Sequence, residues 1–248
     1  MALVLSALAL SLILGAMSQR ICGMGLGLIA VPVFVFFTGP VLGVMTVNIA
    51  AFLTGIVVAW SLRADINWHR WRIIAVWAIV GSLPGALVVK LLPAAPLSLC
   101  IGLALVAALA TSVMVGSATP RIPKQALGAT GFLGGFFNTA VGQAAPVMVL
   151  YQRATKWDQK TFQATLQPSF LVMNAASIAT KGLGLDLPAP PIAPVPFYSL
   201  VMGATVVGLI AGELAAPHVS PAVAKKLAFA VACVGAVVTC IRGIVGMI

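Results

Sequence analysis

The chain has 248 residues, 61% of them hydrophobic and 7% charged, and its mean hydropathy is +1.13. A soluble domain is about 45–50% apolar and about 25% charged. The composition therefore excludes a soluble protein and predicts an all-α polytopic membrane protein. A membrane β-barrel is excluded too, because its segments alternate over about ten residues and the apolar runs here are far longer. The net charge of +10 comes from 14 basic and 4 acidic residues. The basic residues lie mostly between predicted spans, where they set orientation in the bilayer, and they do not indicate nucleic-acid binding.

Residues 1–38 form the first apolar stretch, and it is interrupted. The interruption consists of Gly23, Gly25 and Gly27, with Arg20 just before it. Each glycine weakens a helix by about 1 kcal/mol, and an arginine at the centre of a span costs about 2.5–3.5 kcal/mol. A softened, polar segment that exposes its backbone inside an apolar stretch is typical of a transporter substrate site.

Further along the chain, hydropathy predicts six plain spans, three in each half. They cover residues 41–62, 73–92, 97–115, 162–180, 197–216 and 222–248. A second glycine-broken element occupies residues 126–151. The segment 181–196 is predicted to be a loop, because its five prolines oppose a helix.

The second half of the chain repeats the first. The segment Gly142-Gln-Ala-Ala-Pro146 lies 119 residues after Gly23-Met-Gly-Leu-Gly27. One internal duplication explains this match. It predicts two repeats, residues 1–118 and 119–248, each with one glycine-broken element and three transmembrane helices.

The length of the second broken element favours a re-entrant hairpin. Each of its arms has about 13 residues, or about 20 Å at 1.5 Å per residue, which is shorter than the roughly 30 Å hydrocarbon core. The two repeats are then inverted, and ten basic residues share one side against Lys90, Lys181 and Arg242 on the other. If each broken element is instead a kinked helix that crosses once, the basic residues divide about seven to six and the bias disappears. We therefore expect hairpins, with both termini outside.

Both breaks and their flanks resemble the TauE/SafE family, also called TSUP, of permeases for sulfur-containing anions. The family's G-x-G-G-G break with a following proline is similar to Gly23-Met-Gly-Leu-Gly27 with Pro32, and its G-x-G-G-P is similar to Gly142-Gln-Ala-Ala-Pro146. Its I-D-W-R and F-R-A-T segments resemble Ile66-Asn-Trp-His69 and Phe162-Gln-Ala-Thr165. The resemblance extends over nearly the whole chain and implies a sulfite exporter or another sulfur-anion permease.

The chain departs from the family pattern at five positions. Leu26, Ala144 and Ala145 replace glycines, Gln163 replaces an arginine, and Asn67 replaces an acidic residue. These changes bear on the choice of substrate more than on membership of the family.

The two breaks form the predicted binding site. Half-helices whose N-termini meet near the bilayer midplane present free backbone N–H groups and positive dipole ends, and glycines let an oxyanion approach the backbone. We expect a small anion to bind at Gly23, Gly25, Gly27, Gly142, Gln143 and Ala144, with side-chain hydrogen bonds from Asn48, Asn138, Gln167 and Asn174 and a facing charge from Arg20.

These residues also have purely structural interpretations. Glycines allow close helix packing, and asparagine or glutamine within a membrane often joins helices. Arg20 lies either against the anion or at the membrane surface, where it satisfies hairpin carbonyls. Glu213 is the one carboxylate within a predicted span; it either relays protons for coupling or pairs with Lys225 or Lys226.

The sequence offers no enzyme chemistry. The four cysteines form no C-x-x-C pair, His69 and His218 have no partners at metal-ligand spacing, and no G-x-x-x-x-G-K-[ST] loop occurs. We expect no catalytic residue, cofactor or metal. The predicted function is a secondary transporter (permease) for a small anion, such as sulfite or an organosulfonate, in the bacterial inner membrane, and a homodimer is compatible with it. The alternative is a non-transporting membrane assembly factor or scaffold.

Overall fold

The computed structural model describes residues 1–114, 123–185 and 187–247, and of residues 111–114, 124, 221–225 and 227 it describes the backbone only. Within these ranges the chain forms ten α-helices, two short 3₁₀ helices and no strand. In chain order the elements are α1 (Ala2–Cys22), α2 (Leu26–Thr38), α3 (Pro40–Ser61), η1 (Arg63–Asp65), α4 (Trp68–Leu91), α5 (Ala94–Met114), η2 (Lys124–Ala126), α6 (Leu127–Val141), α7 (Ala145–Ala154), α8 (Gln159–Gly184), α9 (Pro194–Ala215) and α10 (Pro221–Val245). The predicted boundary between the repeats, at residues 118 and 119, lies outside the described residues.

Five helices are long and apolar enough to cross a membrane: α1, α3, α4, α9 and residues 228–245 of α10. Two shorter apolar segments, Leu26–Thr38 and Ala94–Ala110, accompany them. Large apolar side chains are exposed on these helices, for example Leu83 on α4 and Val234 on α10. Extensive exposed apolar surface is characteristic of a membrane-facing protein. The prediction of an all-α polytopic membrane protein is confirmed.

Both glycine-broken elements are interrupted as predicted. The helix α1 ends at Gly23, whose φ is 75°, and α2 starts after Gly25, whose φ is 139°. In the second element α6 ends at Gly142, whose φ is 73°, and α7 starts after Ala144. Glycine adopts positive φ without a steric penalty and commonly ends helices in this way. These three glycines therefore account for the positions of the breaks.

The loop predicted for residues 181–196 is partly wrong. The helix α8 continues through Lys181 to Gly184, because the first proline of the segment is Pro188 and nothing earlier stops the helix. The helix α9 then begins at Pro194, whose fixed φ suits the first turn of a helix. Lys181 consequently belongs to a buried helix and not to a loop.

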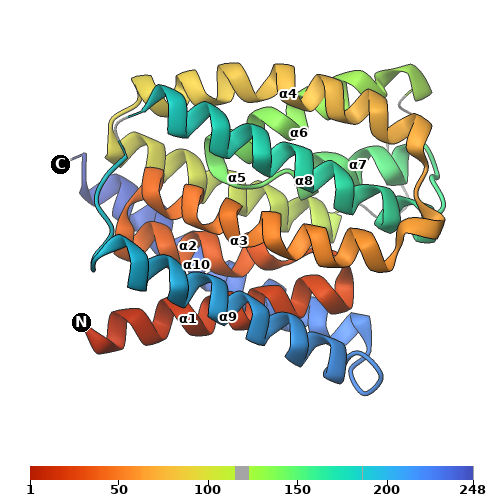
Figure 1. Cartoon of the computed structure of the whole chain (residues 1–248). Coiled ribbons are helices and arrows are strands. Elements are labelled where there is room, and N and C mark those ends of the chain that lie inside the picture. The colour runs from red at the N-terminus through yellow and green to blue at the C-terminus, as the bar shows by residue number, and fades with distance from the viewer. Residues whose placement is uncertain (115–122, 186, 248) are drawn as a thin grey trace.

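The helix bounds repeat with the offset seen in the sequence. The ends of α1 and α6, the starts of α2 and α7, and the starts of α3 and α8 are each 119 residues apart. Packing repeats as well, because α1 lies on α9 as α6 lies on α4, while α3 packs on α8 and α5 on α10. In Figure 1, α3 runs away from the end where both termini lie, and α8 runs toward it. These features support the predicted duplication; its division near residue 118 and the inversion of the repeats stay predictions.

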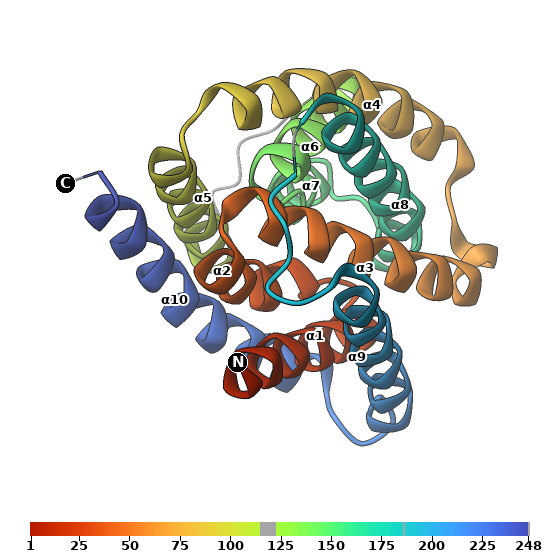
Figure 2. The same ribbon diagram turned by 60° about the vertical axis from the view of Figure 1, so that its left-hand side comes forward.

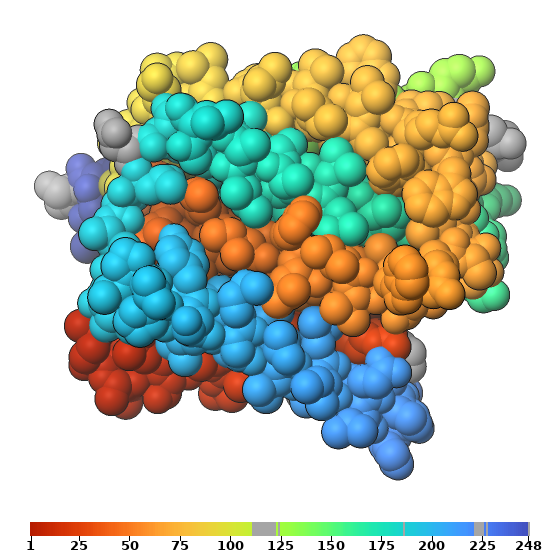
Figure 3. All heavy atoms as spheres, in the orientation of Figure 1, coloured from red at the N-terminus to blue at the C-terminus, as the bar shows by residue number. Residues whose placement is uncertain are grey.

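Glycines bring α4 against α6 and α9 against α1. A Cβ on Gly85 would lie 2.7 Å from the Phe136 carbonyl oxygen, and a Cβ on Gly208 would lie 2.5 Å from the Ile13 carbonyl oxygen. The two pairs lie on opposite sides of α2 and α3 (Figure 2). In the space-filling view α6 and α7 are almost hidden behind α4 and α8 (Figure 3). The broken elements are thereby enclosed by the plain helices.

Basic and polar loops meet at the end of the molecule away from the termini. Lys160 Nζ lies 2.9 Å from Asp65 Oδ1, and the Asn67 backbone N–H donates to Thr165 Oγ1 at 2.9 Å. These contacts join the connection after α3 to the start of α8, and Figure 1 shows both at this end. The expected gathering of positive charge on one side of the membrane stays a prediction.

Candidate functional site

The two breaks touch each other in the interior of the protein. A Cβ on Gly27 would lie 2.9 Å from the Gly142 carbonyl oxygen and 3.1 Å from the Gln143 side-chain nitrogen. A Cβ on Gly142 would lie 2.9 Å from a methyl carbon of Val31 in α2. A side chain at either glycine would push the two breaks apart. The close approach therefore depends on glycine at both positions.

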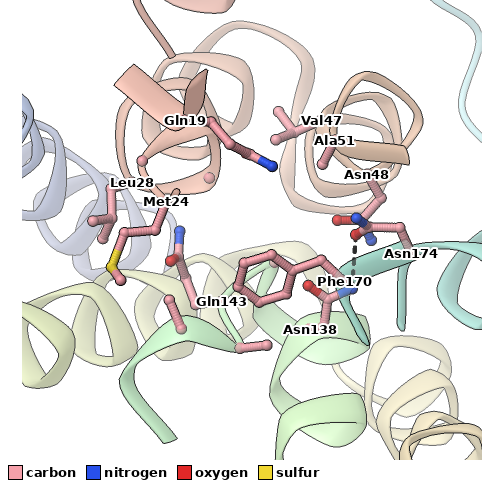
Figure 4. Close-up of a pocket in the computed structure, with 15 residues that line it drawn as sticks. Gln19, Met24, Leu28, Val47, Asn48, Ala51, Asn138, Gln143, Phe170 and Asn174 are labelled. Carbon is pink, nitrogen blue, oxygen red and sulfur yellow. Dashed lines mark hydrogen bonds between the residues drawn. The ribbon is translucent and has the colours of Figure 1, made fainter. Parts of the chain in front are cut away.

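A cavity of about 40 Å³ lies at this junction. One water needs about 10–15 Å³ on this measure, so the space suits a few waters or one small ion. Figure 4 shows side chains from α1, α3, α6 and α8 around it. Eight of the predicted binding residues line the cavity: Gly25, Gly27, Asn48, Asn138, Gly142, Gln143, Ala144 and Asn174.

Two buried amide groups at the cavity lack a partner. The side-chain nitrogens of Gln19 and Gln143 have no hydrogen-bond partner, and both residues are only 4% exposed. Both side chains lie at the cavity in Figure 4. Leaving a buried donor unsatisfied costs about 1–3 kcal/mol. A ligand with hydrogen-bond acceptors would recover that free energy.

Two other amides fasten α8 to its neighbours at the cavity. Asn138 Nδ2 donates to Asn174 Oδ1 at 2.9 Å, which joins α6 to α8 (Figure 4). Asn48 Nδ2 donates to Ser177 Oγ at 2.7 Å, which joins α3 to α8. The amide side chains predicted from sequence thus combine helix-to-helix hydrogen bonds with a place on the cavity wall.

Helix N-termini supply further donors. The first backbone hydrogen bond of α2 runs from the Ile29 N–H to the Gly25 carbonyl, and that of α7 runs from the Met148 N–H to the Ala144 carbonyl. The N–H groups before these bonds have no acceptor within their own helix. The positive ends of both helix dipoles lie at the same place, although Pro146 removes one donor from α7. Helix N-termini of this kind favour anions.

The cavity wall is electrically neutral. None of the described residues that line it is titratable. Its polar groups are amides, and the remainder of the wall is glycine or apolar side chains such as Leu28 and Phe170. Such a site can bind an acceptor-rich ligand through N–H groups, but the described lining offers no nucleophile and no acid or base.

Two predicted residues lie just behind the cavity. Gln167 Nε2 donates to the Gly23 carbonyl oxygen at 2.9 Å, and neither residue lines the space. This bond ties α8 to the turn that ends α1. The hydrogen bond between Gln167 and Gly23 thus stabilises the shape of the first break.

Arg20 and Glu213 form an ion pair with each other away from the cavity. The pair joins α1 to α9, where a Cβ on Gly212 would lie 2.8 Å from Arg20 Cβ. The sequence offered Lys225 or Lys226 as the partner of Glu213, but the packing of α9 on α1 places Arg20 beside it; the side chain of Lys225 lies outside the described residues. Neither member of the pair lines the cavity.

Sequence reasoning missed seven of the lining residues: Gln19, Met24, Leu28, Val47, Ala51, Ala145 and Phe170. Six of these are apolar, and apolar side chains are too common in this sequence to mark a site. Gln19, however, lies 119 residues before Asn138, which also lines the cavity. The offset that matched the two breaks was therefore a usable signal for Gln19.

A family model described as "Sulfite exporter TauE/SafE" matches residues 7–239, which include both breaks and every residue of the cavity. The chain belongs to the TauE/SafE family. Searches of curated proteins and of solved structures each found no match. Membership of the TauE/SafE family makes the chain a membrane transport protein and agrees with its apolar helices.

Proposed function

We propose that this TauE/SafE protein is a secondary permease for a small anion, most simply sulfite, another sulfur oxyanion or a small organosulfonate. The observation that carries the proposal is the junction of two glycine breaks around a small, neutral, donor-rich cavity. Two orphan glutamine amides and two helix N-termini point to an acceptor-rich, negatively charged ligand. The family description supports a sulfur anion.

The absence of a charged side chain from the described wall suits transport more than storage. Several neutral hydrogen bonds contribute about 0.5–1.5 kcal/mol each. An anion held in this way is selected by donor geometry and is still released. We exclude Arg20 from the proposed site, and Glu213, which is paired with it, from any proton relay.

Two inverted repeats provide the proposed route to both sides of the membrane. The first repeat supplies α1–α5 and the second supplies α6–α10, with the cavity at their junction. Small movements of one repeat against the other would open the cavity alternately to each side, as in other transporters built from inverted repeats. The proposed location is the bacterial inner membrane, and the partners are lipid and the transported anion, in a monomer or a homodimer.

Flux into liposomes tests the proposal. Purified protein is reconstituted, and uptake of radiolabelled sulfite, thiosulfate and a small sulfonate is measured down an imposed gradient. Gly25→Val and Gly142→Val are expected to abolish flux, because both glycines have positive φ and adjoin the cavity. Gly203→Val is the matched control, since a Cβ there meets nothing within 4 Å. Absence of flux for every anion in the wild-type protein would favour an assembly factor or scaffold.

A further inference from the structure

One buried charge is not used by the cavity. Lys181, in the last turn of α8, has 0% of its surface exposed, and its Nζ has no hydrogen-bond partner. No other charged side chain that the structure describes is buried. An isolated charge in a protein interior is strongly unfavourable. An ionisable residue inside a membrane protein accordingly marks a functional site by default.

The carboxylates that the structure describes are all engaged elsewhere. Asp65 pairs with Lys160, and Glu213 pairs with Arg20. Asp158 accepts the hydrogen bond that caps the start of α8, at the opposite end of that helix. The buried ammonium group therefore lacks a counter-charge from the described protein, and a bound anion would supply one.

The buried lysine lies on the face of α8 that looks toward the cavity. Asn174, Ser177 and Lys181 follow one another at intervals of three and four residues, which places them on one side of a helix. Asn174 lines the cavity, and Ser177 accepts from Asn48, which also lines it. Lys181 is seven residues beyond Asn174, or about 10 Å along the helix axis. Helical side chains lean toward the N-terminus, which for Lys181 is the direction of Asn174.

A larger hollow begins directly beyond this lysine. It has a volume of about 580 Å³ and is lined by residues 182–185 of the chain, together with Val41, Val89 and Lys90. The C-terminal end of α8 lies at the end of the molecule where the termini are found (Figure 1). Lys181 thus stands in the chain between residues that line the cavity and residues that line the hollow.

We propose that Lys181 is a second anion-binding subsite, on the route between the neutral cavity and the hollow at the termini end. The subsite takes the same small oxyanion as the cavity, and the proposal rests on the proposed transport function. The ammonium group holds the anion while the cavity is empty or filling. The residue 119 positions earlier is Leu62, so the second repeat supplies a charge that the first does not. The route is therefore chemically asymmetric, with this lysine at the termini end.

Sulfite flux in proteoliposomes tests the subsite. At a sulfite concentration well below KM, Lys181→Met is expected to lower flux at least about tenfold, because the variant loses a charge-assisted hydrogen bond to the anion. A tenfold loss corresponds to about 1.4 kcal/mol. Lys181→Arg keeps the charge and is expected to retain flux within about threefold. The matched control is Lys226→Met, which removes an exposed cation that lines neither the cavity nor the hollow and is expected to leave flux within about twofold. Equal flux in wild type and Lys181→Met overturns the subsite and leaves the transport function standing.

Thermal unfolding of the purified variants separates binding from a structural role. Without sulfite, Lys181→Met is expected to unfold at the wild-type temperature or above it, because an unpaired buried charge has been removed. Added sulfite is expected to raise the unfolding temperature of wild type and Lys181→Arg more than that of Lys181→Met. If wild type binds sulfite but transports none, the proposed transport function fails. The difference in the sulfite-induced shift of unfolding temperature between wild type and Lys181→Met then decides the subsite by itself.

A lower unfolding temperature for Lys181→Met in the absence of sulfite would overturn the proposal. It would mean that the lysine stabilises the fold, either through the negative end of the α8 dipole or through a carboxylate. Asp186→Asn distinguishes these two cases, because Asp186 is the one acidic residue outside the described ranges. A loss of stability in Asp186→Asn that matches Lys181→Met would identify the carboxylate as the partner.

Discussion

Replacing Gly27 by alanine tests the contact between the two breaks with a single methyl group. Gly27 does not have positive φ, so alanine adds steric conflict without backbone strain. The new Cβ would lie 2.9 Å from the Gly142 carbonyl oxygen and 3.1 Å from the Gln143 side-chain nitrogen. Overpacking of this kind costs about 1–3 kcal/mol, and alanine recovers up to about 1 kcal/mol through its helix propensity. The expected net loss of stability is therefore about 0–3 kcal/mol.

The effect of Gly27→Ala on transport is expected to be much larger than its effect on stability. Relieving the clash requires the breaks to separate by several tenths of an ångström, and a misplacement of about 1 Å at a binding site can cost about 100-fold. We expect sulfite flux to fall about 10- to 100-fold in proteoliposomes, while denaturant titration reports a protein that is still folded. Gly203→Ala is the control, because its Cβ meets nothing within 4 Å. Wild-type flux in Gly27→Ala would refute a binding site at this junction.

Three further predictions concern side chains around and outside the cavity. Gln19→Leu and Gln143→Leu each remove an unpartnered buried donor, so each should weaken sulfite binding about tenfold without loss of stability, as measured by isothermal titration calorimetry and thermal unfolding. Arg20→Gln and Glu213→Gln should each leave flux unchanged. A double-mutant cycle on unfolding should give a coupling free energy between the two side chains below about 1 kcal/mol, because the Glu213 side chain is 61% exposed. A large loss of flux in either variant would restore the pair to the transport mechanism. Hydrogen bonds that the Asp158 carboxylate accepts from the backbone and side chain of Thr161 lower the pKa of Asp158. Its stabilisation of α8 is therefore complete above the usual carboxyl pKa and is lost as the pH falls through the lowered pKa. Unfolding measured between pH 2 and 6 should show less acid sensitivity in Asp158→Asn than in wild type, and unchanged sensitivity would contradict this.

The sequence predicted the positions of the breaks because each depends on a local backbone property. Positive φ at Gly23, Gly25 and Gly142 is a requirement that glycine meets and most residues do not. The internal offset added long-range information, since it paired residues from both halves before any contact was known. Gly27 and Gly142, which belong to the two matched breaks and line one cavity, could be proposed together on that basis.

What the sequence could not resolve is the direction of side chains on a helix. Gln19 and Arg20 are adjacent in α1, and neighbouring helical residues point about 100° apart. Hydropathy cannot decide which of the two faces inward, and the charge of Arg20 made it the more conspicuous candidate. The structure turns Gln19 to the cavity and Arg20 to α9. The end of α8 was missed for a different reason, because the prolines after residue 187 were taken to act on Lys181 as well.

The neutral wall of the cavity has an energetic consequence for the driving force of transport. With no titratable group on the described lining, the cavity itself adds no proton to the charge that moves with the substrate. Each step across the bilayer then transfers the full charge of the anion, and a membrane voltage does work of about 2.3 kcal/mol per elementary charge at 100 mV. A cell whose interior is negative would expel such an anion without consuming any second solute. The voltage and the concentration gradient of the anion would together set the direction.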